Sequence, residues 1–348
     1  MSETTAGKLG ITLPTINQAY GRLPELAALA DEAGFDSVWD YEVYRNPFTV
    51  HALCAQTTQN VLLATGLATS AGRSPFEMAN AAADVDELSG GRAVIGMSTG
   101  VAGFADHLHG ADVSRPLPKL REYIQCMRVA WDYQSTGQAQ QFEGEFYSFQ
   151  SPPFNPWGGR DLERPRIPIY LGALKPGMLR FAGGAADGVL AYLMSARYIK
   201  EQWLHHVVEG AEIAGRNPSE VDSAALVLCS VGEDREAAMR LARINVGLYA
   251  AYPTSEPMVD YEGLTEDRAA VVNALMSEGP AALAHTTSDA LVKAFAIAGT
   301  PDEAREQLTV FQGAVSHVVL HMPYMPPINR EESERAYLNA VKFLGRSS

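Results

Sequence analysis

Polar, aromatic and glycine residues follow several apolar runs of the sequence, where their side chains could contact a bound molecule. These positions contain no three closely spaced metal ligands, no GxSxG elbow and no Walker sequence. No metal site is therefore predicted, and an organic cofactor fits better than metal-assisted hydrolysis or phosphoryl transfer. The positions are Thr15, Glu42, Tyr44, Arg45, residues 66–70, 98–101, 172–175 and 192–195, Ser230, and residues 321–324.

The segment LGALKPGM, residues 171–178, has the clearest pattern for binding an anion. Gly172 follows an apolar run, Pro176 suits the first turn of a helix, and Lys175 adds a positive charge. Backbone N–H groups at a helix start converge on an anion, helped by the helix dipole. The pattern favours a phosphate or pyrophosphate seat. An ordinary strand-to-helix turn, in which the glycines serve only geometry, has the same spacing.

The segment TGLATSAGRSP, residues 65–75, places Gly66 inside an apolar run. A glycine within a strand marks a close backbone approach or unusual torsions. A flat ring system could lie against this strand end, with Thr69 as a polar contact. From the residues alone, a simple bulge in the wall of the sheet is the favoured interpretation.

Eight apolar runs alternate with helical segments along the chain, which predicts a parallel sheet. Eight such units favour a closed (β/α)8 TIM barrel of the α/β class, although an open doubly wound sheet also alternates. The active site of such a barrel lies at the C-terminal strand ends, where the polar positions above fall. The predicted strands are residues 8–15, 35–40, 61–69, 92–100, 168–174, 188–194, 224–231 and 317–322.

The chain is interpreted as a single domain, residues 1–348, with three insertions. Phe142, Phe146 and Phe149 around Gly144 predict a surface hairpin. The section from Asp234 to about Gln312 reads as helical but is too long for one helix, so it contains an insertion. The insertions are expected near residues 101–116, 140–165 and 250–300.

Composition and charge limit the classes of function. The chain has 348 residues, of which 47% are hydrophobic, so general disorder is excluded. Its 27 Lys and Arg against 41 Asp and Glu give a net charge of −14, the wrong sign for binding nucleic acid or an acidic membrane surface. Three distant cysteines indicate buried thiols and no disulfide or zinc framework. With no signal sequence or long apolar run, a cytoplasmic protein is expected.

Three segments resemble the bacterial-luciferase-like oxidoreductase family. They are GFDSVW (residues 34–39), SPFEMANAAADVDELSGGRAVIGMSTG (74–100) and PIYLGALKPGMLRFAGGAADGVL (168–190). The resemblance implies a (β/α)8 barrel with insertions. It also implies either FMN, used by monooxygenases, or the deazaflavin coenzyme F420, used by reductases and dehydrogenases. The third segment is most similar to the F420-using branch that includes methylene-tetrahydromethanopterin reductase.

In that branch a bulge with a non-prolyl cis peptide lies at the end of the third strand, against the deazaflavin ring. The resemblance places this bond at Gly66–Leu67 and places the cofactor phosphate at residues 172–175. Together with the fourth strand end, the expected cofactor contacts are Gly66, Leu67, Thr69, Gly100, Gly172, Ala173, Leu174 and Lys175.

The sequence departs from the family pattern just beyond the second strand. Many members carry Asp-His there, after a tryptophan that matches Trp39. Here the sequence is WDYEVY, so Glu42 takes the place of the aspartate and Val43 that of the histidine. Glu42 either acts as an acid or base or only holds the ring or the loop, and both alternatives stay open. His321, at the last strand end, is the other candidate for a chemical role.

Histidine and aromatic side chains near the strand ends suggest an apolar substrate pocket. Isolated histidines are more often structural than catalytic, and aromatic residues in loops often pack only against a hairpin. His109 and a neighbouring histidine in the insertion HLHG could form a lid. The expected substrate contacts are Tyr44, His51, His107, Trp157, Tyr192 and His321.

The favoured function is an F420-dependent oxidoreductase that transfers hydride between the deazaflavin and a small organic substrate. One alternative is an FMN-dependent monooxygenase supplied with reduced flavin by a partner reductase. The other is a cofactor-binding barrel without turnover, which the absence of a histidine at Val43 favours. A homo-oligomer, at least a dimer, is expected because barrels of this family commonly associate.

Overall fold

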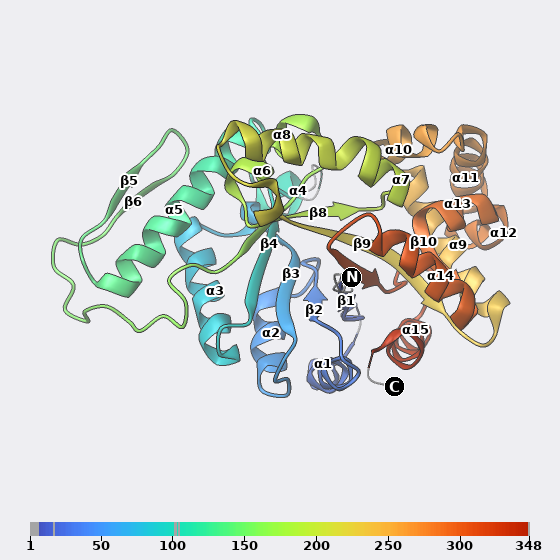
Figure 1. The fold of residues 1–348 in the computed structure, drawn as a ribbon, viewed down its shortest axis with the longest axis horizontal. Coiled ribbons are helices and arrows are strands. Elements are labelled where there is room, and N and C mark those ends of the chain that lie inside the picture. Colours follow the sequence, from blue (N-terminus) through green and yellow to red (C-terminus); the bar gives the residue numbers. More distant parts are fainter. Residues whose placement is uncertain (1–6, 17, 101–102, 104, 347–348) are drawn as a thin grey trace, which may run out of the picture.

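The computed structural model describes residues 7–16, 18–100, 103 and 105–346, and its centre is a closed barrel of parallel strands (Figure 1). The barrel strands are β1 (Lys8–Thr12), β2 (Ser37–Asp40), β3 (Leu62–Thr69), β4 (Ala93–Ser98), β7 (Ile169–Gly172), β8 (Gly188–Tyr192), β9 (Asp222–Val231) and β11 (His317–His321). They pair in the order β9-β11-β1-β2-β3-β4-β7-β8, and β8 pairs with β9 to close the ring. This confirms the predicted (β/α)8 barrel.

Helices cover the outside of the barrel because each strand is followed by a segment that buries one apolar face. Local signals set their bounds: at the start of α3 the Ser74 side chain accepts from the Glu77 N–H, and Gly90 ends the helix with a φ of 65°. The surrounding helices are α1 (Arg22–Glu32), α2 (Pro47–Ala55), α3 (Pro75–Ser89), α5 (Pro116–Thr136), α6 (Pro176–Ala185), α7 (Ala196–Tyr198), α8 (Leu204–Ile213), α9 (Arg235–Ala251), α14 (Pro301–Gln312) and α15 (Arg330–Leu344).

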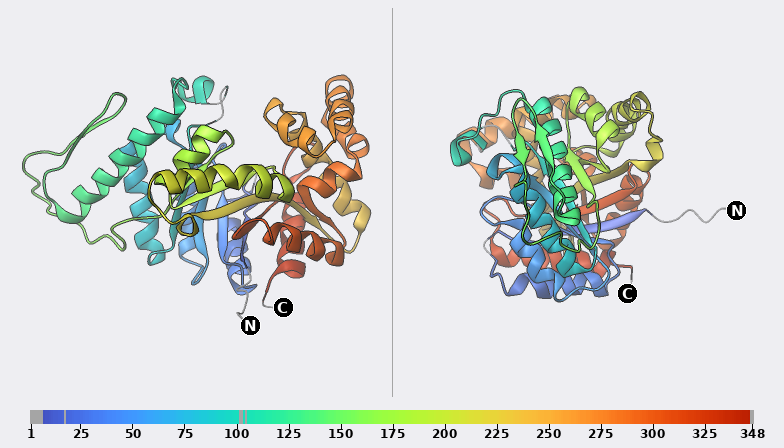
Figure 2. Two further views of the ribbon diagram at one scale, coloured as in Figure 1. Left: turned by 45° about the horizontal axis from the view of Figure 1, so that its top comes forward. Right: turned by 90° about the vertical axis from the view of Figure 1, so that its left-hand side faces the viewer.

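Shorter elements fill the stretches where insertions were expected. The predicted hairpin is present, and Phe142 pairs with Phe149 across it. It projects beyond α5 at one end of the molecule, and the helices after α9 lie at the other (Figure 2). Val101, where the first expected insertion begins, lies outside the described residues. The elements are α4 (Ala105–His109), β5 (Gln141–Glu143), β6 (Ser148–Gln150), α10 (Glu256–Tyr261), α11 (Thr265–Glu278), α12 (Leu283–Thr286) and α13 (Asp289–Phe295).

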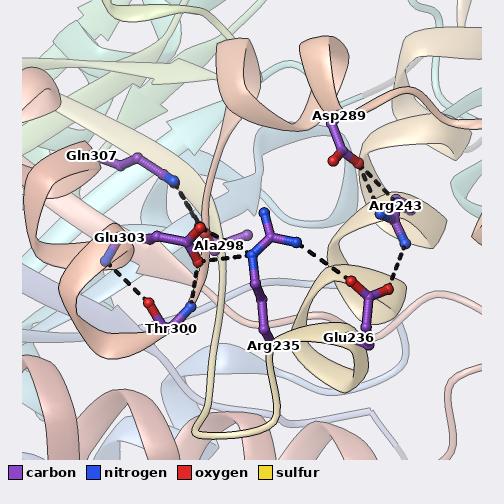
Figure 3. Close-up of polar contacts among 8 residues, drawn as sticks. All are labelled: Arg235, Glu236, Arg243, Asp289, Ala298, Thr300, Glu303 and Gln307. Carbon is purple, nitrogen blue, oxygen red and sulfur yellow. Dashed lines mark hydrogen bonds and ion pairs between the residues drawn. The ribbon is translucent and has the colours of Figure 1, made fainter.

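One strand was missed, because residues 234–312 were read as helical. β10 (Ala296–Gly299) follows α13 directly and pairs in parallel with the far half of β9, outside the ring. A four-residue apolar run cannot be distinguished from part of a helix by periodicity alone. The Gln307 side chain covers the free edge of β10 by bonding both the N–H and the carbonyl of Ala298, at 2.7 and 3.0 Å (Figure 3).

Ion pairs attach the same region to α9. Glu303 accepts from the Arg235 guanidinium at 2.9 Å and forms a capping box with Thr300 (Figure 3). Arg243 of α9 contacts Asp289, the first residue of α13, at 2.8 Å. The insertion is thereby fixed to the helix that follows β9.

The core has two apolar layers, one inside the barrel and one between the barrel and the helices. Alternation along β2 sends Trp39 inward and Val38 outward. The interior layer consists of Trp39, Ala64, Val94, Tyr170, Leu190, Ala224, Leu226 and Val319. Among the helices of the described residues, none combines the length and the apolar character that crossing a membrane requires.

Candidate active site

A bulge at the end of β3 stands at the mouth of the barrel, where the C-terminal strand ends meet. The register between β3 and β4 shifts between Thr65 and Ala68, and the Gly66–Leu67 peptide bond is cis. This is the bond that the family resemblance pointed to. The indole ring of Trp39 lies directly beneath it, since a Cβ atom on Gly66 would be 2.9 Å from Cε3 of that ring.

Two further glycines make room for the bulge because they have no side chain. A Cβ atom on Gly96 of β4 would lie 1.9 Å from the carbonyl oxygen of Thr65. A Cβ atom on Gly172 of β7 would lie 2.3 Å from Cδ1 of Leu67. Gly172, predicted as a phosphate contact, therefore has a packing role: it makes room for the side chain that follows the cis bond.

Glu42 connects the loop after β2 to the bulge. Its carboxylate accepts from the Thr69 N–H at 2.7 Å and from the Arg73 guanidinium at 3.0 and 2.6 Å. The Glu42 N–H donates to the Leu67 carbonyl at 3.4 Å. The ion pair is nearly buried, with side-chain exposures of 12% for Glu42 and 11% for Arg73. Because both carboxylate oxygens are engaged, the arrangement favours the loop-holding alternative for Glu42.

Thr69 and Gly100 come together beside the bulge. Gly100 has a φ of 85°, and a Cβ atom there would lie 2.7 Å from Oγ1 of Thr69. The same hydroxyl accepts from the Ala71 N–H at 3.3 Å. The short helix α4 packs over this turn, and the His109 ring approaches Gly72. The His107 side chain on α4 is 80% exposed, and its Nε2 lies 4.0 Å from a carboxylate oxygen of Asp106.

The turn between β7 and α6 leaves a helix start open to solvent. Lys175 precedes the first residue of α6, and its side chain makes no cap hydrogen bond, in contrast to the Ser74 cap of α3. The Met178 and Leu179 N–H groups donate to the Lys175 carbonyl at 3.0 Å. Leu174 and Lys175 are exposed, whereas Ala173 is buried and its carbonyl accepts from Trp203 Nε1 at 2.9 Å. Leu174, Lys175 and the helix start are therefore the accessible part of the predicted phosphate seat.

His321 lies at the end of β11 on the other side of the mouth. Its Nδ1 contacts Oγ1 of Thr12 at 3.2 Å, and its Nε2 contacts the hydroxyl of Tyr192 at 3.2 Å. Burial lowers the pKa of His321 to about 3, so the ring is neutral at pH 7. Two predicted residues, His321 and Tyr192, are thus brought into direct contact.

Three further tyrosines complete this group: Tyr324, which lies within the predicted positions 321–324, and Tyr41 and Tyr249, which were not predicted. The rings of Tyr41 and Tyr324 lie 5.5 and 5.4 Å from the imidazole, and the Tyr249 hydroxyl bonds that of Tyr324. Buried Asn245 of α9 accepts from the Tyr324 N–H at 3.2 Å and so positions it. Tyr41 directly follows β2, a signal that could have identified it, whereas Tyr249 lies in the helix α9.

The structure separates other predicted residues from the mouth. His51 is 1% exposed behind β3 and bonds the Ala64 carbonyl at 3.0 Å; burial lowers its pKa to about 4, so it is a neutral structural donor. Trp157 lies beside the far end of α5, where the Arg160 N–H donates to Gln134 at 2.7 Å. Neither contacts the residues described above, so both substrate assignments are corrected.

Tyr44 lies at the mouth but is largely exposed. With Thr15, Tyr41 and Arg45 it lines a pocket of about 310 Å³. Within the described part of the chain, possible metal ligands gather on α8, as His205, His206 and Glu209, and not around this pocket.

Comparisons with a family model and with curated proteins agree on one family. The family model described as luciferase-like monooxygenase matches residues 4–317. The chain is 31% identical to 5,10-methylenetetrahydromethanopterin reductase of Archaeoglobus fulgidus, over 88% of this chain and 91% of that protein.

Solved structures share the fold across almost the whole chain. The coenzyme F420-dependent tetrahydromethanopterin reductase of Methanopyrus kandleri superposes with a TM-score of 0.80 at 25% identity, covering 97% of this chain and 98% of that one. The oxygenating constituent of 3,6-diketocamphane monooxygenase from Pseudomonas putida, solved with FMN, gives a TM-score of 0.69 at 17% identity, covering 98% of each chain. At that identity the second likeness concerns the fold alone.

Proposed function

Because the chain belongs to the luciferase-like monooxygenase family, we propose that it is a coenzyme F420-dependent oxidoreductase that transfers hydride between the deazaflavin and a small organic substrate. The observation that carries this proposal is the 31% identity to a methylenetetrahydromethanopterin reductase over 88% of this chain, together with the register shift of β3 at the mouth of the barrel. An FMN monooxygenase has the same fold, but the more similar relatives are named as reductases.

The residues at the mouth fit such a cofactor. The three glycines at positions 66, 96 and 172 hold the bulge where a flat ring can lie against it, and Gly100 keeps its backbone close to Thr69. The start of α6, where the Lys175 side chain makes no cap hydrogen bond, offers the positive end of a helix dipole to a phosphate. Lys175 adds the charge that an anionic cofactor needs on a protein with a net charge of −14.

When bound, the deazaflavin supplies hydride chemistry, and the chain supplies position and polarity. The bulge fixes one face of the ring, so a substrate has to approach the other face. Tyr192, Tyr324 and the neutral His321 form a connected group of hydroxyl and imidazole hydrogen-bonding atoms on the opposite side of the mouth. We assign these residues the role of orienting the polar atom of the substrate.

Turnover of a relative's substrate tests the proposal. The purified protein is mixed with reduced or oxidised F420 and with methylene- or methyl-tetrahydromethanopterin, and the deazaflavin absorption band is followed. A substrate-dependent change of the band supports an F420 oxidoreductase. Oxygen uptake with reduced FMN, without any F420 reaction, would favour the monooxygenase, and binding without turnover of any tested substrate would leave an inactive barrel.

Reversing the charge at Lys175 tests the phosphate seat. Lys175→Glu is expected to weaken F420 binding about tenfold or more, because a carboxylate would replace a charged partner of the phosphate. The measurement is a titration followed by deazaflavin fluorescence, at low and at high salt. Lys293→Glu, an exposed site on α13, is the matched control and should bind like the unmodified protein. Equal affinity of both variants would place the phosphate elsewhere.

A further inference from the structure

The last residue of β2, Asp40, is a buried carboxyl that no charged side chain of the described residues contacts. It is fully buried, and its Oδ1 accepts from the Tyr41 N–H at 2.8 Å. Its Oδ2 has no hydrogen-bond partner of normal geometry within the described residues. In the sheet it pairs with Thr65, the residue just before the cis bond. An unsatisfied buried carboxyl is costly, so its place beside the bulge calls for an explanation.

A second buried aspartate shows what a structural carboxyl looks like in this protein. Asp86 of α3 is 1% exposed, and it accepts from the Ala93 N–H at 3.1 Å and from the Arg164 guanidinium at 3.1 Å. Both of its oxygens are engaged and its charge is paired. Asp40 lacks both features.

The surroundings of Asp40 raise the pKa of its carboxyl toward neutral pH. Burial raises the pKa of Asp40 to about 7, and the Thr15 hydroxyl, the Tyr41 N–H and the charge of Arg45 oppose this only in part. The charge of Glu42 raises the pKa of Asp40 further. On the side of α2, the titratable neighbour of Asp40 is the buried thiol of Cys54. Arg45 does not bond the carboxyl: its Nη2 donates to the Gln18 carbonyl, and its Nη1 has no partner within the described residues.

Thr15 links Asp40 to the pocket. Its hydroxyl lies close enough to the Asp40 carboxyl and to the Tyr41 phenol to lower the pKa of both groups. Thr15 and Tyr41 line the 310 Å³ pocket, and the Tyr41 ring lies 5.5 Å from His321. A path of proton-carrying groups therefore runs from the buried carboxyl to the mouth of the barrel.

We propose that Asp40 exchanges the proton that accompanies hydride transfer, acting through Thr15 and Tyr41, in place of the histidine that is absent at Val43. This inference rests on the proposed function. In the reducing direction the substrate carbon takes hydride from the reduced deazaflavin, and the substrate heteroatom takes the Tyr41 proton. Tyr41 takes one from Thr15, and Thr15 takes one from Asp40. Asp40 regains a proton from water, and the oxidised deazaflavin releases its remaining proton to water.

The first test needs neither cofactor nor substrate. Because burial raises the pKa of Asp40 from 3.8 to about 7 in the folded state, the folded protein binds an extra proton between pH 4 and 7 and loses the associated stability as the pH rises through 7. Relative to Asp40→Asn, the unfolding equilibrium constant of the unmodified protein should rise roughly a thousandfold from pH 4 to pH 8. Urea unfolding at a series of pH values measures this ratio.

Infrared difference spectra of the same samples should contain a protonated-carboxyl band with a midpoint near pH 7 that Asp40→Asn lacks. Asp86→Asn is the matched control: at pH 8 it should lower stability, whereas Asp40→Asn should raise it. A ratio that does not change with pH, or a band that persists in Asp40→Asn, would overturn the assignment of the ionising group.

The second test is the pH profile of turnover with F420 and the substrate used above. The change of the turnover rate around pH 7 that the unmodified protein is expected to have should be absent in Asp40→Asn. Thr15→Val should lower kcat more than tenfold and move the midpoint of the carboxyl band to higher pH, because the Thr15 hydroxyl lowers the pKa of Asp40, while the F420 affinity stays unchanged. Absence of F420 binding by the unmodified protein would overturn the proposed function, whereas turnover with identical pH profiles in both proteins would overturn the role of Asp40 alone.

Discussion

An alanine at position 96 is expected to displace the β3 bulge and to lower the free energy of unfolding by about 3 kcal/mol, the upper end of the usual cost of overpacking. The added Cβ atom would lie 1.9 Å from the backbone carbonyl oxygen of Thr65. A flexible side chain could turn away from such a contact, but a carbonyl oxygen moves only with its strand. F420 binding should be lost together with the bulge.

Urea unfolding and an F420 titration measure the two effects of Gly96→Ala. Gly21→Ala is the matched control, because Gly21 has a helical φ of −65° and no atom within 4 Å of an added Cβ. It should stay within about 0.5 kcal/mol of the unmodified protein and bind F420 normally. A Gly96→Ala protein that keeps both its stability and its affinity would contradict the packing described for the bulge.

The second large effect is expected at the ion pair between Glu42 and Arg73. Arg73→Met should cost about 3–5 kcal/mol, because it leaves a nearly buried carboxylate without its charged partner. Glu42 would still accept from the Thr69 N–H but would no longer be held by Arg73, so the end of β3 would be fixed less firmly. The F420 affinity should therefore also fall. Thermal unfolding and the F420 titration measure these changes.

Two comparisons isolate the buried pair. Arg305→Met removes an exposed pair with Asp302 and should change stability by less than about 1 kcal/mol. Glu42→Gln combined with Arg73→Met should recover part of the stability, since no lone charge remains. If Arg73→Met were as mild as Arg305→Met, Glu42 would not depend on this pair, and its acid–base alternative would become the better interpretation.

Much of the barrel could be predicted because most of its strands are largely apolar runs bounded by turn residues. Strands of a parallel sheet that are buried on both faces, such as residues 62–69, have mainly apolar sequences. β10 could not be predicted, because four small apolar residues directly after α13 carry no period of their own. Its position depends on the edge of β9 and on Gln307, contacts that are distant in the sequence.

The candidate site was only partly predictable for a similar reason. The Gly66–Leu67 bond was located through the family resemblance, while its support by Gly96 appears only when three strands are placed side by side. Asp40 is hidden in a strand, where nothing local indicates that its carboxyl lacks a partner. Trp157 was assigned to the pocket as an aromatic residue in a loop, and the loop leads to the opposite end of the barrel.

A competitive titration of F420 against FMN on one sample of the purified protein tests the central claim most directly. We expect saturable binding of F420, about tenfold weaker in Lys175→Glu, and FMN affinity lower than that of F420. Tight FMN binding with no detectable F420 binding, or F420 binding that is indifferent both to Lys175→Glu and to Gly96→Ala, would contradict a deazaflavin site at the mouth of this barrel.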